Sequence, residues 1–458
     1  MKNFGSTSGL TVLAEDQSTP ANGMVAYVTS SYNSGYQNGD IKGAFLSDTD
    51  DTDLVATELV TNGTFDTDLT GWTDNSFGAG TSTQSGGELV LTTGPAGVTD
   101  RSEAYQGFAT EIGKSYLASM SVTSTVSDNC VLQVGTAPSA GNLLQISGLG
   151  VGTAVGTFVA TTTTSYFTAV GPQSAGAATI DNISVKLADA DRSVNNNGLA
   201  INGTVTRSPV ATGADLVAYG GWSTTGAKNN YLYQPYNSDL DFGTNFCFIT
   251  WVKVDGAVGS QDQHFFDLSP VDLSGRINVF WNHNAAKFQF APGNGGTNVT
   301  TSSPGYGNWH QLVCTASASS TQIYLDGALS STGAGGFNHV LQSDAYLTIG
   351  ARTTEYLGNA YGLNGSVALM RLSKTIPSPE QIAKIYEDEK VLFQDGAQAT
   401  LYGSSDAVTA LAYDDSTEIL SVGTSSGRSD FQGLRRVNNT TNAVGAAISA
   451  SNGMIVEE

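Results

Sequence analysis

The sequence predicts an all-β protein made of several β-sandwiches, and three observations support this prediction. Only 13% of the 458 residues are charged, while glycine contributes 54 residues, which is typical of a chain rich in tight turns. Apolar residues make up 40% of the chain and repeatedly alternate with polar residues, which is the period of a half-buried strand. The length exceeds what one ordinary core uses, so we expect about two to four domains.

The charge balance excludes several classes of partner. The chain carries 41 acidic and 19 basic residues, a formal net charge of −22. Phosphate backbones and anionic lipids repel such a chain, so we expect neither nucleic-acid binding nor binding to a membrane surface. The sequence has no stretch of about 18 apolar residues, so we also expect no membrane insertion.

The first residues and the cysteines bear on where the chain folds. Residues 1–9 contain no apolar run of the kind that forms a secretion signal, so we expect folding and assembly in a reducing cytoplasm. Cys130, Cys247 and Cys314 are odd in number and far apart in the sequence. We therefore predict buried free cysteines rather than disulfides or a metal site.

The first half of the chain begins with a polar arm and continues into a strand-rich region. Residues 1–38 are mostly polar, with one short apolar run at 24–28, and predict an N-terminal arm. Residues 41–49 predict a strand that an acidic turn follows. From about residue 57 to 188, short alternating segments are separated by Gly, Ser and Asn, which predicts a sandwich or jelly roll.

Two motifs at the ends of this region carry a resemblance. Asn62–Asp66 followed by Leu69–Trp72 opens the region, and Ile180–Val185 closes it. This pattern resembles the jelly-roll carbohydrate-binding modules attached to cellulases and xylanases. The resemblance implies a sugar-binding sandwich of roughly 130 residues.

Three further motifs occur in order in the second half. They are Trp309–Val313, Ile323–Gly327 and Leu347–Gly350, and an apolar strand at 246–253 precedes them. This order resembles the laminin-G-like, concanavalin-type lectin sandwich. The resemblance implies a second β-sandwich of a fold that also includes glycoside hydrolases.

The start of this lectin-like domain suggests a nested arrangement. Asp191–Leu199 resembles the opening of the lectin family, but the strand that should precede it is found at 41–49 instead. We therefore predict that one domain is inserted into a loop of the other, which exposed loops tolerate. The predicted division is an arm at 1–38, a discontinuous lectin-like sandwich at 39–52 and 189–392, an inserted jelly roll at 53–188, and a C-terminal segment at 393–458.

The last hundred residues predict one helix and an isolated β unit. Ser378 as N-cap, Pro379 at the first position and Gln381 at the third predict a helix over about 378–389. Residues 393–458 resemble one blade of a β-propeller, but the period of about 40–45 residues is not repeated. Because a single blade cannot bury both faces, we predict that it docks on a neighbour or on copies of itself, most simply in a homotrimer.

The sequence offers no catalytic constellation, and we predict no catalytic residues. Its four histidines are isolated from cysteines and from paired acids in sequence: His264, His283, His310 and His339. Glycoside hydrolysis needs paired carboxylates on a strand face, whereas the one tight acidic cluster, 387–389, ends the predicted helix. We expect those acids to be solvated.

The resemblance to jelly-roll modules implies a structural calcium ion. Such modules commonly bind Ca²⁺ between their first and last strands, through oxygens near the opening motif and a closing aspartate. Asp181 matches the closing position, and Asp66 replaces the family's glutamate. Hard oxygen ligands without nearby cysteine or histidine favour Ca²⁺ over zinc. The alternative is that each aspartate caps a β-turn.

Sugar recognition uses aromatic rings that stack on the apolar faces of pyranoses. Trp251 and Trp309 lie on apolar strands and are predicted to be core residues, and Trp72, which belongs to the opening motif, also favours a core position. The candidate glycan-binding residues are Trp72, Tyr105, Tyr116 and Tyr166 in the inserted region and Trp222, Tyr231, Tyr233 and Tyr236 in the lectin-like region.

In composition and domain pattern the chain resembles tail-fibre, spike and head-fibre proteins of marine bacteriophages. That resemblance implies a virion structural protein that attaches to cell-surface polysaccharide and contacts other virion proteins. Two alternatives stay open: a secreted bacterial adhesin or non-catalytic carbohydrate-binding accessory protein, and a glycoside hydrolase of lectin-like fold.

Overall fold

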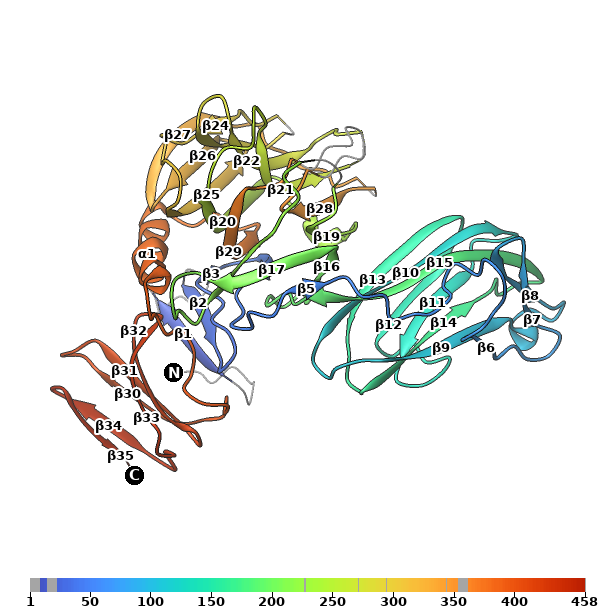
Figure 1. Ribbon diagram of the computed structural model, residues 1–458, viewed down its shortest axis with the longest axis horizontal. Helices are drawn as coiled ribbons and strands as arrows, with labels where there is room; N and C mark the ends of the chain where they lie inside the picture. Colours follow the sequence, from blue (N-terminus) through green and yellow to red (C-terminus); the bar gives the residue numbers. More distant parts are fainter. Residues whose placement is uncertain are drawn as a thin grey trace.

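The computed structural model describes residues 9–14, 23–225, 228–270, 272–293, 295–342, 344–352 and 361–457. Figure 1 shows three parts: a large sandwich, a small sandwich that extends to its right, and a C-terminal sheet at the lower left. Regular structure in the described residues is nearly all β, with a single α-helix, α1 (Pro379–Glu389). The all-β prediction and the predicted helix are confirmed.

The small sandwich packs two sheets around one core. The first sheet contains, in order, β12 (Leu144–Leu149), β11 (Cys130–Gly135), β14 (Thr164–Val170), β9 (Glu103–Ala109) and β6 (Thr73–Asp74). The second is formed by β7 (Thr81–Ser85), β8 (Glu88–Thr93), β15 (Gly176–Asp189), β10 (Ser115–Thr125) and β13 (Gly152–Val159), with the 3₁₀ turn η2 (Gly97–Asp100) after β8. Alternate residues of both sheets, such as Leu89, Met120 and Phe167, fill the space between them.

The large sandwich also has two sheets. One contains β27 (Ala328–Ala334), β26 (Ser320–Leu325), β25 (Trp309–Ser317), β20 (Asn245–Val254), β29 (Gly365–Ser373), β18 (Val217–Gly220), β17 (Thr204–Pro209) and β5 (Leu54–Val55), with β4 (Ile41–Phe45) also paired to β29. The other contains β16 (Leu199–Asn202), β19 (Tyr231–Gln234), β28 (Tyr346–Ile349), β21 (Gln263–Ser269), β22 (Ile277–Asn282), β23 (Lys287–Ala291) and β24 (Val299–Thr300). A core rich in phenylalanine, including Phe246, Phe248 and Phe266, lies between them.

The two sandwiches share one continuous sheet. The last residues of β15 pair with β16, with Ala188 opposite Ala200 and Asp189 opposite Leu199. Twelve strands thereby form one sheet through both sandwiches. Because β4 precedes the small sandwich in sequence yet pairs with β29 of the large one, the chain enters and leaves the small sandwich from the same partner.

The N-terminal segment differs from the predicted polar arm. β1 (Leu10–Ala14), β2 (Met24–Val28) and β3 (Gln37–Asn38) form a three-stranded sheet, whereas residues 1–8 and 15–22 of the predicted arm lie outside the described residues. The side chains of Met24, Ala26 and Tyr36 are buried among those of the nine-stranded sheet and α1. The alternation within β2 therefore gives this segment a buried face that its polar composition concealed.

Helix α1 is fixed at both ends. Ser378 accepts a hydrogen bond from the Gln381 backbone, and the Gln381 side chain accepts one from the Ser378 backbone, which completes a capping box. At the other end Glu389 is fully buried and pairs with Arg371 of β29, so the expectation of a solvated acidic cluster is wrong for Glu389, whereas Glu387 is exposed. The short turn η5 (Lys390–Phe393) follows.

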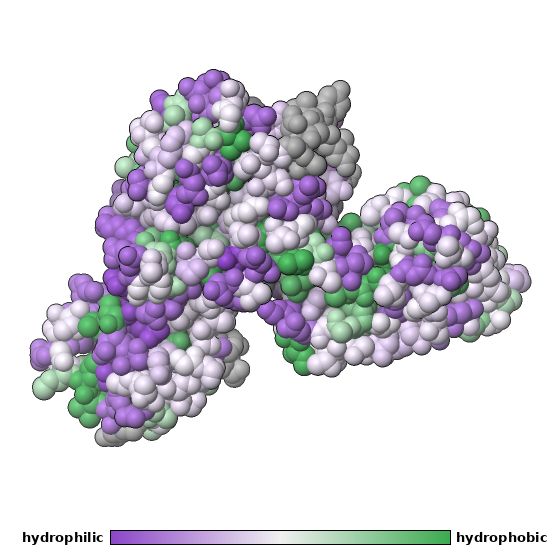
Figure 2. Space-filling view, viewed as in Figure 1, coloured by the Kyte–Doolittle hydropathy of each residue, from purple (hydrophilic) through white to green (hydrophobic). Residues whose placement is uncertain are grey.

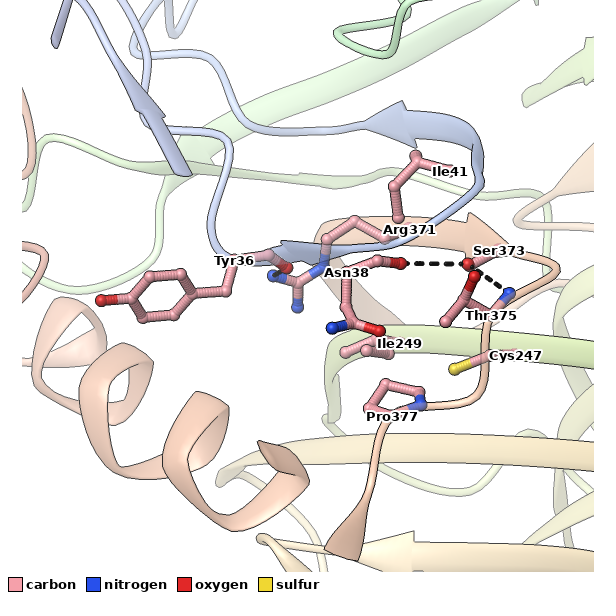
Figure 3. Close-up of a pocket in the computed structure, with 9 residues that line it drawn as sticks. All are labelled: Tyr36, Asn38, Ile41, Cys247, Ile249, Arg371, Ser373, Thr375 and Pro377. Atoms are coloured by element: carbon pink, nitrogen blue, oxygen red, sulfur yellow. Dashed lines mark hydrogen bonds between the residues drawn. The ribbon is translucent and has the colours of Figure 1, made fainter. Parts of the chain in front are cut away.

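A small cavity lies in the seam between the N-terminal segment and the large sandwich. Figure 3 shows Arg371 directed at the Tyr36 backbone, where Nη1 donates to the Tyr36 carbonyl at 3.0 Å. Ser373 donates to the Asn38 carbonyl at 3.3 Å in the same seam. These bonds attach the N-terminal segment to β29, so the cavity is part of a structural joint.

The C-terminal residues form a four-stranded antiparallel sheet and a hairpin. The strands are β30 (Val408–Asp414), β31 (Ile419–Thr424), β32 (Gly427–Gln432) and β33 (Arg435–Thr440), followed by β34 (Ile448–Ser451) and β35 (Met454–Glu457). Arg436 donates to the Thr400 carbonyl at 2.8 Å, which links this sheet to the segment after α1. Within the described part of the chain, no helix is long and apolar enough to cross a membrane.

Candidate functional site

Three tyrosines gather on the outer face of the shared sheet where it belongs to the large sandwich. In β19, Leu232 faces the core, so its neighbours Tyr231 and Tyr233 point to the outer face. Their ring centroids are 5.8 Å apart. Tyr346, at the start of the adjacent strand β28, is 39% exposed. We call Tyr231, Tyr233 and Tyr346 the tyrosine face.

The environment of Tyr233 keeps its hydroxyl protonated. Burial raises the pKa of Tyr233 to about 12, and the neighbouring Tyr231, Tyr346 and Glu58 add to this effect. The Tyr233 hydroxyl therefore stays protonated at neutral pH and can both donate and accept hydrogen bonds. The Lys228 ammonium lies 4.4 Å from the Tyr231 ring centroid, a cation–π contact at the edge of the tyrosine face.

A row of polar side chains continues from the tyrosine face across the sheet. The strand register places Tyr233 opposite Thr348, Thr348 opposite Asp267, and Asp267 opposite Asn278. Residues opposite one another in neighbouring strands share a face, so all four side chains lie on the outer side of the sheet. The 3₁₀ turn η3 (Ser238–Leu240) follows β19 and carries the buried Leu240.

Charged groups complete the far end of this row. Arg276 binds both oxygens of Asp267, with Nε at 2.9 Å from Oδ1 and Nη2 at 2.5 Å from Oδ2. His264 stacks on Phe280 with centroids 4.9 Å apart, and its Nδ1 lies 3.4 Å from Arg276 Nη2. Burial, followed by Arg276 and Arg352, holds the pKa of His264 well below its usual range, so the ring is neutral.

A second aromatic pair lies on the outer face of the five-stranded sheet in the small sandwich. Tyr105 and Tyr166 have ring centroids 6.1 Å apart. The Tyr166 ring passes over Gly107, where an added Cβ would approach it to 3.0 Å. Gln133 and Thr168 lie in the same cross-strand row as Tyr105. We call Tyr105, Tyr166, Gln133 and Thr168 the small-sandwich face.

One carboxylate lies beside the small-sandwich face and is fully engaged. Glu103 is buried, forms an ion pair with Arg101 Nε at 2.8 Å, and accepts hydrogen bonds from Asn75 and Ser139. Arg101 Nη2 in turn donates to Gln133 at 3.3 Å. The ion pair therefore holds the Gln133 amide in place. It also leaves neither Arg101 nor Glu103 as an unpaired charge beside the small-sandwich face.

Three of the eight predicted glycan-binding residues are core residues, which corrects the prediction. Trp72, 9% exposed, packs on Phe65 and donates from its indole nitrogen to two backbone carbonyls. Tyr116 and Trp222, 3% and 5% exposed, are also enclosed in cores, so none of the three offers an open ring face. Tyr236 is exposed in the loop after β19.

Of the predicted calcium ligands, Asp66 lies in an exposed bend and Asp181 is half-buried within β15. Asp66 accepts a hydrogen bond from Thr64 at 2.9 Å, and Asp181 accepts one from the Asn182 backbone at 2.7 Å. Among the residues that the structure describes, no group of three or more His, Cys, Asp or Glu side chains gathers in a way that could hold a metal ion. Two locally bonded carboxylates do not fit the six to eight oxygen ligands that Ca²⁺ takes. Calcium binding stays a prediction.

Sequence reasoning missed several residues of the outer face. Tyr346, Arg276, His264 and Arg352 were not among the candidates, although the alternation of β28 and β22 could have placed Tyr346 and Arg276 on the outer side. The three cysteines, by contrast, are buried and free, as predicted.

Residues 224–383 match the sequence model of the concanavalin A-like lectin/glucanases superfamily, in its laminin-G type. The match covers β19 to α1 and confirms the lectin-like prediction for that part of the chain. No curated protein matches the chain.

Several solved structures are distantly similar. Domain 4 of the arabinanase AbnA from Geobacillus stearothermophilus, in complex with arabinotriose, is 13% identical over 43% of this chain and 92% of its own, with a TM-score of 0.33. A sialidase CBM40 from Ruminococcus gnavus, bound to α2,3-sialyllactose, is 11% identical over 36% and 94%, with a TM-score of 0.28. The receptor-binding domain of a botulinum neurotoxin C/D mosaic is 11% identical over 44% and 48%, with a TM-score of 0.34. These likenesses are too distant to assign a ligand.

Proposed function

We propose that this chain is a non-catalytic glycan-binding protein and that the tyrosine face binds the sugar. The observation that carries the proposal is the gathering of Tyr231, Tyr233 and Tyr346 on one outer sheet face. Aromatic rings stack on the apolar faces of pyranoses, while a few polar groups beside them recognise the hydroxyls. The tyrosine hydroxyls and the Lys228 ammonium, 4.4 Å from the Tyr231 ring centroid, supply such groups, whereas Thr348 and Asn278 in the neighbouring row are only 1% and 4% exposed.

The engagement of the nearby carboxylates supports a non-catalytic role. Glycoside hydrolysis uses two carboxyl groups on either side of the scissile bond, one as acid and one as nucleophile or base. In the polar row Asp267 is bound at both oxygens by Arg276, and at the small-sandwich face Glu103 is bound by Arg101. Neither carboxylate is available for proton transfer or attack in this arrangement.

The proposed setting is a virion, where the chain is a tail fibre, spike or head fibre that attaches particles to host-surface polysaccharide. We further propose that it assembles as a homotrimer through the C-terminal sheet. Apolar groups reach the surface of the C-terminal region (Figure 2), and its exposed side chains include Tyr413 and Val437 in the sheet and Met454 and Val456 in the hairpin. Mass spectrometry of purified particles tests the setting, and light scattering of the full chain tests the trimer.

The experiment for glycan binding uses the full chain and affinity electrophoresis through gels that each contain one polysaccharide. We expect retardation in at least one gel, and we expect the double variant Tyr231→Ala/Tyr346→Ala to lose it. Tyr27→Ala is the matched control, because Tyr27 is a similarly exposed tyrosine, 37%, in the N-terminal sheet. Equal retardation of the two variants would refute the assignment to the tyrosine face.

A further inference from the structure

One arginine beside the polar row lacks the partners that all other arginines have. Every other arginine in the described chain makes an ion pair or a hydrogen bond through its guanidinium. Among the described residues, neither an ion pair nor a hydrogen bond is found for the Arg352 guanidinium, whose carbon lies 5.8 Å from the centroid of the Tyr361 ring. Its Nε is buried without a hydrogen-bond partner, as are those of Arg101, Arg371 and Arg428, so the missing carboxylate is what distinguishes Arg352. A buried, unsatisfied donor of a charged group costs free energy, more than a neutral one does.

The neighbouring carboxylates are already committed to other cations or donors. Asp267 is bound at both oxygens by Arg276. Asp262 lies 3.0 Å from His283 Nδ1 and also accepts from the His283 backbone. Among the described residues, the positively charged guanidinium of Arg352 therefore has no carboxylate at hydrogen-bond distance.

The other groups around Arg352 increase its demand for an anion. Burial lowers the pKa of Arg352, and the like charge of Arg276 lowers it further. His264, which contacts both Arg276 and Tyr361, supplies no negative charge because it is neutral. An anionic group bound at the half-buried Arg352 would offset the repulsion between the two guanidinium groups.

Arg352 is also correctly placed to share a ligand with the tyrosine face. It follows β28, whose first residue is Tyr346, so at most about 20 Å of chain separates the two side chains. Thr348 and Asp267, which lie in the outer row, are 1% and 0% exposed, so the ligand would contact Tyr346, which is 39% exposed, and the half-buried Arg352 rather than this row. An oligosaccharide of a few sugar units is long enough to reach from one to the other.

Resting on the proposed function, we infer that the glycan is anionic and that Arg352, beside Arg276, binds its charged group. The group is a sugar-borne carboxylate, as in a uronic acid, or a sulfate ester. Both offer oxygens that match the paired donors of a guanidinium. The net charge of −22 opposes this ligand only at long range, because charges separated by more than about 8 Å are screened at physiological salt.

The test measures affinities of the full chain by calorimetry at physiological ionic strength with two matched pairs of short ligands. One pair is oligogalacturonate and its methyl ester, and the other is dextran sulfate oligomers and dextran of the same length. We expect at least one charged ligand to bind about tenfold more tightly than its neutral partner, a difference of about 1.4 kcal/mol. Which pair shows the difference distinguishes a carboxylate from a sulfate.

Arg352→Gln should abolish that preference, and Arg352→Lys should retain part of it. Arg435→Gln is the control, because Arg435 hydrogen-bonds Gln394 in an exposed position far along the chain and should leave the preference unchanged. Thermal unfolding confirms that each variant is folded, and Arg352→Lys provides the comparison if the Gln variant is not. Equal weakening by the Arg352 and Arg435 variants would overturn the assignment to Arg352.

The outcomes separate the inference from the proposed function. Equal affinities within both pairs, with loss of binding in Tyr231→Ala/Tyr346→Ala, would overturn the anionic ligand and leave glycan binding intact. Absence of binding to all four ligands would overturn the inference for both charge classes, while the polysaccharide gels would still decide the proposed function.

Discussion

The two sandwiches present similar pairs of tyrosines on outer sheet faces, yet they differ in how charge is placed beside them. On the small-sandwich face, Arg101 and Glu103 form a closed pair, and amide and hydroxyl groups make up the rest of the row. Beside the tyrosine face, Arg276 and Asp267 also pair, but Arg352 is left over. Under the proposed function, the aromatic rings would mark where a sugar can stack, and the charge balance beside them would select which sugar.

The large sandwich also carries a layer of α1 and the N-terminal segment on the outer side of its nine-stranded sheet. In this layer the buried Glu389 accepts from Arg371, from the Trp251 indole at 2.8 Å and from the Tyr36 backbone at 3.0 Å. This single carboxylate connects α1, β20, β29 and the N-terminal segment. The attachment of this layer to the large sandwich therefore depends on a buried charge.

Removing that charge pair gives the largest expected effect. Arg371→Leu leaves Glu389 buried without its cation, which should lower the free energy of unfolding of the large sandwich by about 3–5 kcal/mol. Differential scanning calorimetry should show the large-sandwich transition moved to lower temperature and the small-sandwich transition unchanged. Lys384→Leu, which removes only the surface pair with Asp388, is the control and should cost less than about 0.5 kcal/mol. A uniform shift of both transitions would contradict the contrast.

The next largest expected effect concerns the pH dependence of stability at the junction of β15 and β16, where the two sandwiches meet. Asp189 is buried at the end of β15, and burial raises its pKa to about 6, with a further contribution from Asp48. A raised folded pKa stabilises the fold at low pH and loses that stabilisation as pH rises toward 6. In the wild type, the free energy of unfolding should therefore fall by up to about 3 kcal/mol between pH 4 and pH 6, and Asp189→Asn should remove this fall.

Urea unfolding of the wild type and Asp189→Asn at pH 4, 5, 6 and 7 measures this difference. The Tyr219 hydroxyl, which donates to Asp189 at 3.2 Å, can make the same bond to the amide oxygen of asparagine. Parallel pH profiles of the two proteins would show that Asp189 does not titrate in this range.

A smaller effect sharpens the contrast between the two faces. Tyr105→Ala/Tyr166→Ala should weaken binding of a neutral oligosaccharide about tenfold, because stacking on two rings is lost. The same variant should leave the preference of the tyrosine face for an anionic ligand unchanged. Calorimetry with the dextran and galacturonate pairs checks both parts, and a matching loss for the anionic ligand would mean that the faces do not act separately.

Calcium should have the smallest effect. Because Asp66 and Asp181 are engaged by Thr64 and Asn182, we expect Ca²⁺ at 1 mM to change the melting temperature of the small sandwich by less than about 1 °C. Scanning calorimetry with Ca²⁺ and with chelator measures it. A rise of several degrees that Asp181→Ala abolishes would establish the metal site.

Features encoded in adjacent residues could be predicted from the sequence. The capping box of Ser378, Pro379 and Gln381 located α1, because all its hydrogen bonds are made within four residues. Tyr231 and Tyr233 were candidates as aromatic residues of the lectin-like region, and the structure places both on one face of β19. The domain boundaries at 53, 189 and 393 stay predictions.

Features that depend on distant pairing could not be predicted in the same way. β15 belongs to both sandwiches because its last residues pair with β16, and nothing in the sequence of either strand indicates this pairing. The burial of Glu389 depends on Arg371 and on the N-terminal segment, which are remote or were taken for a polar arm. The isolation of Arg352 is visible only when the partners of Asp267 and Asp262 are known.

The sheet shared by the two sandwiches has a mechanical consequence. A flexible linker would let the small sandwich turn freely, but here the ladder between β15 and β16 holds it against the strand next to β19. A rotation of the small sandwich would therefore be passed on, through the hydrogen bonds of β16, to β19, the strand that carries Tyr231 and Tyr233. This pairing sets the distance and angle between the two sandwiches, so under the proposed function a polysaccharide bound by both would have to fit that fixed spacing.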